Sequence, residues 1–341
     1  MRQALSWVPW VLWSAALPGV AAAAEEKRKP CFSNPMPDTR SIAISRDGGF
    51  AGAGDLESFH VLAGGLAPTG FMKFSFRPVH MAPHPDRPQF AVAAGSVRIV
   101  DMATRKTAAE LKPASWFVAW RRGGAELLGI DYDKSVHIWD VATRKELQRW
   151  KLPLDKKTHS RFEDHADAAS LLALGFDDGT VRIFETAGGR EVATIKAHPV
   201  EGEIKMTGMA LSPDGRRLAT CDYGQVKVWE VATGEMKHRF STKPGGLASQ
   251  VRFYANGTRL AFANYTGSGY GFDFIEADTG KRLARATVTG HDAVESWDMA
   301  FPDSEEPTIL LLANETLYLC PYSAATGKGP GIKVIGGSPE P

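Results

Sequence analysis

The chain has 341 residues, with 40 Lys and Arg against 39 Asp and Glu and a formal net charge of +1. This balance argues against a nucleic-acid binder, whose contact surface carries an excess of basic residues. The 34 Gly, 21 Pro and 43% apolar residues are typical of a turn-rich globular protein made of short strands. Three Cys are too few for a fold that disulfides hold together.

The first 24 residues have the features of an export signal. Met1-Arg2 is followed by an apolar stretch from Ala4 to Leu17, and then by small residues that a signal peptidase accepts, directly before Glu25. An uncleaved membrane anchor is the alternative, although Ser, Pro and Ala interrupt the apolar run. We expect a signal peptide over residues 1–24, export to the periplasm or the extracellular space, and a mature chain without a membrane span.

The rest of the chain repeats one pattern roughly every 43 residues. Each copy alternates β-branched residues, reaches a position that Trp can occupy, and ends in a Thr-Gly or Thr-Arg turn. This pattern predicts a strand that enters a hairpin. The Trp position holds, in order, Leu62, Val100, Trp139, Phe184, Trp229, Ile275 and Tyr322.

A second signature precedes the first in several copies and ends in a Gly turn, as in Gly208–Gly215 and Gln250–Gly257. An apolar strand such as Arg217–Cys221 separates the two signatures, and another, such as Met236–Phe240, follows the hairpin. Each unit therefore has four antiparallel strands with apolar residues on both faces.

Such units need neighbours on both sides, and radial packing about an axis provides them. The repeats predict an all-β fold, a seven-bladed β-propeller of four-stranded antiparallel blades. We place the propeller at residues 39–335, after an N-terminal segment at 25–38 and before a flexible tail at 336–341.

The repeats resemble those of the WD-repeat family of β-propellers, over roughly Arg40 to Gly327. Segments such as Ser135–Lys145 and Gln225–Glu235 carry the resemblance. The copies are degenerate, because the Trp-Asp pair fills its position once, as Trp139-Asp140. Together with the export signal, the resemblance implies a secreted or periplasmic, bacterial-type member.

Blades of this family are often tied by a hydrogen-bonded His, Ser or Thr, Asp and Trp. The resemblance implies that Asp133 and Asp178 occupy the Asp position of their blades. It also implies that Tyr223 replaces this Asp in the repeat that contains Trp229.

The sequence contains no Gly-x-Ser-x-Gly elbow, phosphate-binding Gly-rich loop, His-Glu-x-x-His or Cys-x-x-Cys motif. His80 and His84 are four residues apart, but Pro83 and Pro85 prevent the helix that would put both on one face. We therefore expect no catalytic residue, no metal and no cofactor.

By resemblance to the family, the loops before the inner strands and before the Trp-position strands lie on one rim. Aromatic and His side chains on such a surface are frequent in binding hot spots, although each alone is more often structural or incidental, Trp116 and Trp297 above all. The predicted partner-binding rim residues are His80, Trp116, Tyr132, Asp133, Asp177, His198, Tyr223, Tyr265, His291 and Trp297.

Two classes of function follow. The first is a non-catalytic scaffold whose rim or central channel binds a protein, peptide or glycan. The second is a propeller enzyme, a hydrolase or lyase with a channel-bound metal, which would need His and carboxylate side chains to converge from several inner strands. Fold alone does not decide between them. We expect the scaffold, not an enzyme, acting as a monomer on a protein or peptide partner.

Cys31 precedes the first blade, and Cys320 lies in the Trp-position strand of the last. The family often closes its ring by pairing a strand from one terminus with strands from the other. If Pro30 to Pro35 runs beside the strand of Cys320, the two cysteines meet the distance that a disulfide requires. The alternatives are three unpaired core cysteines, or a last blade completed by Ile332 to Ile335. Cys221 is the expected free, buried thiol.

Overall fold

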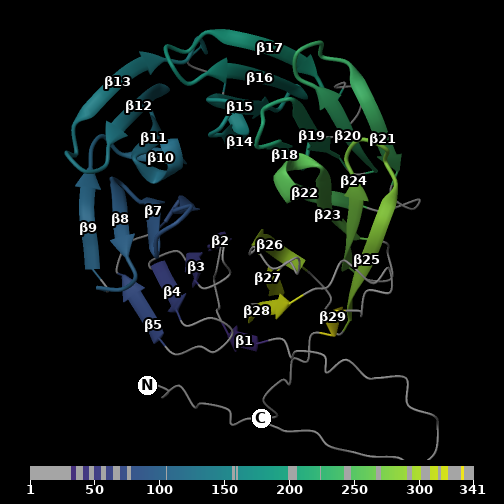
Figure 1. The fold of residues 1–341 in the computed structure, drawn as a ribbon, viewed down its shortest axis with the longest axis horizontal. Coiled ribbons are helices and arrows are strands. Elements are labelled where there is room, and N and C mark those ends of the chain that lie inside the picture. The colour runs from purple at the N-terminus through teal and green to yellow at the C-terminus, as the bar shows by residue number, and fades with distance from the viewer. Residues whose placement is uncertain are drawn as a thin grey trace, which may run out of the picture.

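The computed structural model describes residues 32–35, 41–45, 50–54, 59–63, 70–74, 78–104, 106–155, 158, 160–198, 206–222, 224–241, 247–265, 270–289, 294–300, 308–313, 316–321 and 332–333. The strands in these ranges form small sheets that stand around a central axis (Figure 1). Within each sheet, consecutive strands of the sequence are neighbours and pair antiparallel.

Five sheets follow one another along the chain. The first holds β2 (Ser41–Ile44), β3 (Phe50–Gly54), β4 (Phe59–Ala63) and β5 (Gly70–Phe74). The next holds β6 (His80–Pro83), β7 (Gln89–Ala93), β8 (Val97–Asp101) and β9 (Lys106–Leu111). It is followed by β10 (Ser115–Arg121), β11 (Glu126–Asp131), β12 (Ser135–Asp140) and β13 (Glu146–Lys151). Then come β14 (Ser160–Ala166), β15 (Leu171–Phe176), β16 (Thr180–Glu185) and β17 (Glu191–Lys196). The fifth holds β18 (Gly208–Leu211), β19 (Arg217–Cys221), β20 (Gln225–Glu230) and β21 (Met236–Ser241).

The later sheets draw on both ends of the chain. One holds β22 (Leu247–Tyr254), β23 (Arg259–Tyr265), β24 (Tyr270–Glu276), β25 (Arg282–Thr289) and β29 (Ile332–Lys333). The other holds β26 (Val294–Ala300), β27 (Thr308–Ala313), β28 (Thr316–Pro321) and β1 (Phe32–Pro35). Two 3-10 turns, η1 (Arg122–Gly124) and η2 (Ala255–Gly257), follow β10 and β22.

The N-terminal strand β1 completes the sheet of β26–β28. It pairs antiparallel with β28, and the inner strand β2 contacts β26, so that the first and last sheets meet. The C-terminal strand β29 instead pairs in parallel with β25, on the outer edge of the preceding sheet. The alternative in which Ile332 to Ile335 completes the last blade is therefore wrong for Ile332–Lys333.

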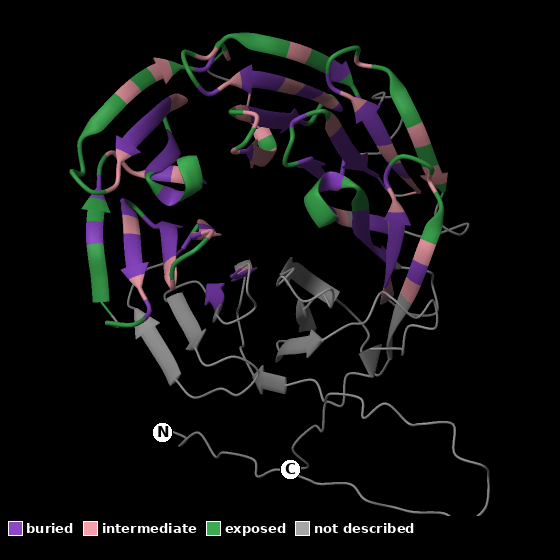
Figure 2. Ribbon diagram, in the orientation of Figure 1, coloured by how far each residue is buried: buried purple, intermediate pink, exposed green. Residues whose placement is uncertain are grey.

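The apolar core lies between adjacent sheets. On β11, Leu127 packs with Val118 and with Ile99 of the preceding sheet, whereas Leu128 packs with Leu172 of the following one. Middle strands such as β11 are buried throughout, and outer strands such as β13 are mostly exposed (Figure 2). Two apolar faces per sheet explain the ring, because each face needs a neighbour.

The Thr of the repeated hairpin turns stabilises those turns directly. Asp140 Oδ1 accepts hydrogen bonds from the amide and the hydroxyl of Thr143, each at 2.6 Å. Asp101 and Thr104 form the same pair, at 2.8 and 2.9 Å. An acidic residue three positions before Thr is therefore a turn cap that recurs around the ring.

These observations confirm an all-β propeller of four-stranded antiparallel sheets. The count of seven blades and the boundaries at 25–38, 39–335 and 336–341 stay predictions, because residues 1–31 and much of 290–341 lie outside the description. No helix within the described ranges is long and apolar enough to cross a membrane.

Candidate binding rim

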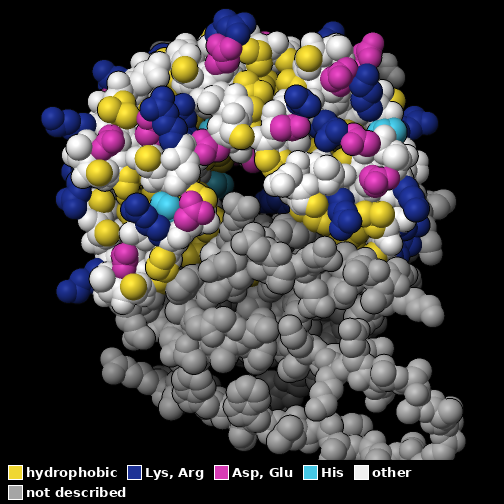
Figure 3. Space-filling model, viewed as in Figure 1, with side chains coloured by type: hydrophobic (Ala, Val, Ile, Leu, Met, Phe, Trp, Pro, Cys, Tyr) yellow, Lys and Arg dark blue, Asp and Glu magenta, His cyan; other side chains and the backbone are white. Residues whose placement is uncertain are grey.

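The strands of each sheet alternate in direction. The turn between the second and third strands therefore lies at the same end of the sheet as the segment that leads to the next sheet. We call this end, with the β11–β12 and β15–β16 turns, the rim. The opposite end, which carries η1 and η2, faces the viewer in Figure 1. That opposite end carries intermingled acidic and basic side chains (Figure 3).

Tyr132 lies on the β11–β12 turn, and its side chain is 64% exposed. The turn is held by Asp131, whose Oδ1 accepts from the Ser135 amide at 2.8 Å and whose carbonyl accepts from the Lys134 amide at 3.0 Å. Trp116 Nε1 donates to the same carbonyl at 2.9 Å. The turn thus presents an aromatic ring to solvent from a well-bonded backbone, and Asp133 beside it is also exposed.

Asp177 lies on the β15–β16 turn and is exposed. Its Oδ1 is 3.0 Å from Arg161 Nη1 on β14, and both side chains are more than half exposed. Such a solvated ion pair stabilises a fold by only about 0–1 kcal/mol. Its charges therefore remain available to a partner. Arg161 was not among the predicted residues, because an isolated Arg carries no sequence signal for a rim.

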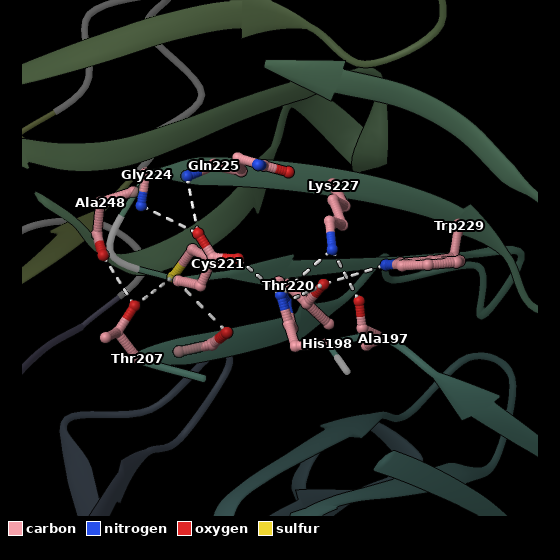
Figure 4. A network of polar contacts seen from close by, with 12 residues as sticks. Ala197, His198, Thr207, Thr220, Cys221, Gly224, Gln225, Lys227, Trp229 and Ala248 are labelled. Atoms are coloured by element: carbon pink, nitrogen blue, oxygen red, sulfur yellow. Dashed lines mark hydrogen bonds and ion pairs between the residues drawn. The ribbon is translucent and has the colours of Figure 1, made fainter. Parts of the chain in front are cut away.

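His198 is not part of an exposed surface, which corrects its prediction as a rim residue. Only 2% of it is exposed, and both ring nitrogens are bonded: Nδ1 to Asp222 Oδ2 at 2.8 Å and Nε2 to Thr220 Oγ1 at 2.9 Å. Trp229 Nε1 donates to the same hydroxyl oxygen at 2.9 Å. With the proton on Nδ1, each contact from Trp229 through Thr220 and His198 to Asp222 pairs one donor with one acceptor. Figure 4 shows Trp229, Thr220 and His198 in this network, with Lys227 Nζ 3.3 Å from His198 Nδ1.

Asp222, not Tyr223, completes this network, so the expectation that Tyr223 replaces the Asp is wrong. Asp222 Oδ1 also accepts from the amides of Gly224 and Gln225, at 2.9 and 2.8 Å. Burial alone would raise the pKa of Asp222, but the hydrogen bonds from His198 and from these amides outweigh it and hold the pKa below its usual value. The His, Thr, Asp and Trp that the resemblance implies are thus present in the sheet of β18–β21.

In the sheet of β10–β13 the corresponding carboxylate is Asp131, not Asp133. His137 Nε2 is 2.9 Å from Asp131 Oδ2, and His137 Nδ1 is 2.6 Å from Glu146 Oε1 on β13. The ring is 1% exposed and stacks on Trp139 with 5.4 Å between centroids. Asp178, the other expected position, is exposed and caps the Thr180 amide and hydroxyl at 2.9 and 2.6 Å.

His80 and Trp116 are partly enclosed near the starts of inner strands. His80 begins β6, and its ring lies 4.6 Å from that of Phe117. Burial lowers the pKa of His80 to about 4, and the charge of Arg252 acts in the same direction. His80 is therefore neutral near pH 7. Trp116 is half-buried and bonded to the Asp131 carbonyl, as above, so its role includes support of the turn.

The other predicted rim residues stay predictions. Tyr265 ends β23 and Trp297 lies within β26, strands for which the backbone at these positions is described. Tyr223 and His291 lie outside the described residues, as does Cys31.

No group of three or more His, Cys, Asp or Glu side chains suited to a metal occurs within the described part of the chain. His84 Nδ1 accepts from the amides of Asp86 and Arg87, each at 3.0 Å. Glu163 on β14 is half-buried, and burial raises its pKa to about 7 against the opposing hydrogen bond from Ser160. Neither His84 nor Glu163 therefore belongs to a cluster of metal-binding side chains within the described part of the chain.

Comparison with known proteins points to one family. Residues 164–256 match the family model for the WD40 domain of anaphase-promoting complex subunit 4. The chain is 30% identical over 169 residues to cilia- and flagella-associated protein 52 of Mus musculus, covering 49% of this chain and 26% of that protein. It is 34% identical over 110 residues to telomerase protein component 1 of Rattus norvegicus, covering 32% of this chain and 4% of that protein.

A solved structure shows the same fold. The β-propeller domain of Myceliophteria thermophila Cps50 (Swd1) aligns with a TM-score of 0.64, at 13% identity, over 84% of this chain and 99% of that domain. The matches span small parts of the curated relatives, so those proteins' own activities do not transfer to this chain. Together the fold and the matched segment are similar to those of WD40-repeat β-propellers, which are typically protein-interaction scaffolds.

Proposed function

We propose that the protein is a non-catalytic scaffold that contacts a protein or peptide partner through the rim, within a monomeric ring of seven blades. One observation carries the proposal: Tyr132, 64% exposed, stands on a turn whose backbone Asp131 and Trp116 hold in place. A Tyr has few rotatable bonds, and on a turn whose backbone is already held it loses little conformational entropy on binding and provides a large contact area.

The surroundings of Tyr132 suit a polar border around that aromatic contact. Asp133 adjoins it, and the next sheet places Asp177 and Arg161 at the same end. Protein interfaces commonly combine a central aromatic anchor with a charged, solvated periphery. Export to the periplasm or the extracellular space is part of the same proposal and rests on residues 1–24 of the sequence. The alternative, a hydrolase or lyase with a channel-bound metal, draws no support from the comparisons.

The test compares two exposed apolar side chains of one sheet. Tyr132→Ala removes the rim aromatic, and Leu147→Ala removes a side chain that is 55% exposed on the outer strand β13. Tagged full-length wild type and both variants are used to enrich proteins from an extract of the source organism, with quantitative mass spectrometry. The candidate partner is then purified and its affinity measured.

We expect a partner that wild type and Leu147→Ala bind alike and that Tyr132→Ala binds about tenfold or more weakly, the effect typical of a hot-spot residue. The melting temperatures of all three proteins should agree, because neither side chain is buried. If every enriched protein binds Tyr132→Ala as tightly as wild type, the rim around Tyr132 is not the contact surface.

A further inference from the structure

The sheet of β22–β25 is the one sheet in the described part of the chain that has a fifth strand. This strand, β29, lies parallel to the outer strand β25, with Ile332 opposite Val288 and Lys333 opposite Thr289. Figure 1 shows β29 beside one end of β25. The outer edge of this sheet therefore accepts a strand from elsewhere in the chain.

The end of β25 differs from the ends of the other outer strands. With eight residues, β25 is longer than β5, β9, β13, β17 and β21, which have five or six. Its last four residues, Ala286–Thr289, carry no charge, and three of them are β-branched. The last four residues of each of the other five strands include at least one Lys, Arg or Glu. Charged side chains on an edge strand oppose the addition of a further strand, so the end of β25 lacks this protection.

The chain's own segment holds this edge by a short ladder. β29 pairs with two of the eight residues of β25. In the sequence, Pro330 stands two residues before Ile332, and Pro has no N–H to donate. A segment without Pro could pair with more of β25 and displace β29, because main-chain hydrogen bonds provide the affinity in strand addition.

The start of β25 adds a preference for charge. Arg282 and Arg285 both bond Asp273 of β24, at 3.0 and 2.7 Å. Two guanidinium groups thus share one carboxylate, and the side chain of Arg282 is 55% exposed. In a parallel alignment the N-terminal end of an incoming segment lies at this end of β25, where an acidic side chain would be attracted. A second copy of β25 would instead bring two more Arg.

We propose that the outer edge of β25 is a docking site for an extended segment of a partner protein, which adds in parallel and displaces β29. The segment that fits has an acidic residue at its N-terminal end, followed by β-branched residues without Pro. This surface lies on the outer strand of its sheet and is separate from the rim, so the proposal does not depend on Tyr132.

The probe is a fluorescent peptide of residues 329–341 that carries Gly329→Glu and Pro330→Thr. In the observed register its position 329 lies opposite Arg285. One control peptide has Gly329→Lys in place of Gly329→Glu, and the other carries Ile332→Pro in addition. Fluorescence anisotropy measures the affinity of each for the full-length protein.

We expect the additional Ile332→Pro to weaken binding about fivefold or more, because it removes a ladder N–H. The peptide with Gly329→Lys should bind about threefold or more weakly at low salt, and this difference should shrink as salt is added. In hydrogen exchange the probe should slow the amides of β25 and not those of β13 or β21. If the probe and its Ile332→Pro form bind alike, or if another outer strand is protected, the proposal is wrong.

Variants of the full-length chain test whether β29 competes for the edge. Lys333→Pro removes an amide of β29 and should bind the probe at least about threefold more tightly than wild type, because the edge is then open in more of the molecules. Ser338→Pro, beyond β29, and Tyr132→Ala, on the rim, should bind it as wild type does. A probe that binds neither wild type nor Lys333→Pro, or that binds both equally, would overturn the displacement of β29.

Discussion

Two aspartates, Asp131 and Asp222, have the same task in different sheets. Each accepts backbone amides of the turn before the Trp-position strand, and each bonds a buried imidazole, His137 or His198. A buried carboxylate that has several hydrogen-bond donors stabilises the folded state, whereas the same group without them would destabilise it. His137 lies on β12 of the same sheet and turns Nε2 toward Asp131, whereas His198 follows β17 of the preceding sheet and turns Nδ1 toward Asp222.

The substitution Asp222→Asn should lower the free energy of unfolding by about 1–3 kcal/mol, because an amide cannot provide two charged acceptor oxygens. The pKa of Asp222 is held below its usual value in the fold, so its contribution is present above the unfolded pKa and is lost as pH falls through the folded pKa. Denaturant unfolding at pH 7 and near pH 3 measures the difference, which should shrink in acid. The exposed Asp178→Asn is the control, and an equal effect of both variants at pH 7 would contradict the role of Asp222.

Glu163 gives the opposite pH dependence. Burial raises its pKa to about 7, so between about pH 4.5 and pH 7 the unfolded chain loses this proton before the folded chain does, and stability falls as pH rises. Glu163→Gln removes the ionisation and should stabilise the protein at pH 8, by up to about 3 kcal/mol, with little effect at pH 4. Melting curves across this range test it against the exposed Glu110→Gln. A gain for Glu163→Gln that is the same at both pH values would be unexpected.

The position of these aspartates could not be read from the repeats. Without gaps, Ser135 aligns with Gln225, yet the turn carboxylate lies four residues before Ser135 and three before Gln225. Asp133 and Tyr223 both lie two residues before the aligned position, and because the two turns differ in length no single offset in an ungapped alignment locates both carboxylates. The burial of His198 could not be predicted from the sequence either, because its partners Thr220 and Asp222 are distant in the sequence and come close to it only in the folded protein.

At the scale of elements, the alternation of apolar residues predicted the strands well. The expected strand at Arg217–Cys221 is β19, and the one at Met236–Phe240 is β21 less its last residue. A short apolar run identifies a strand whose two faces are both buried between neighbouring sheets, as in β19, whereas alternation is typical of a half-buried strand, as in β21. The parallel pairing of β29 with β25 had no such pattern, since two residues define no period.

The β15–β16 turn packs closely against the backbone of Ala197 and His198, the two residues that follow β17. Gly179 has φ +75°, and its carbonyl accepts from the amides of Ala197 and His198, each at 3.0 Å. A Cβ at Gly179 would lie 1.8 Å from the His198 carbonyl oxygen. The close approach of two backbones therefore requires Gly at this position.

Gly179→Ala and Gly95→Ala form a matched pair. Both glycines have φ +75°, but a Cβ at Gly95 would meet nothing within 4 Å. Gly95→Ala should therefore show only the strain of a left-handed Ala, about 1 kcal/mol, whereas Gly179→Ala should lose about 2 kcal/mol or more because the backbone must also move. Chemical denaturation measures both. Equal losses would mean that the turn relaxes away from His198 without penalty.

At the scale of the molecule, the repeats predicted a closed all-β ring, and the structure adds how its ends meet. The sheet of β2–β5 and the sheet of β26–β28 meet because β2 contacts β26, and β1 joins the latter sheet by pairing with β28. The sequence left open which terminus would complete the last sheet, because Phe32–Pro35 and Ile332 to Ile335 are both short segments next to the repeats. The pairing partners depend on the ring's geometry, which no local pattern encodes.

The closure predicts unequal effects of trimming the two ends. A chain that begins at Met36 lacks β1 and leaves β28 as an exposed edge of a three-stranded sheet, whereas a chain that ends at Pro330 lacks only β29, which pairs two residues on the outside of a complete sheet. Unpaired edge strands invite aggregation.

The two shortened chains are compared with a chain that begins at Glu25, under reducing conditions, so that Cys31 adds no covalent bond. Removal of β1 should lower the melting temperature by several degrees and promote association in light scattering, and removal of β29 should change neither much. If the chain that begins at Met36 melts with the reference while the chain that ends at Pro330 does not, the C-terminal strand, and not β1, closes the ring.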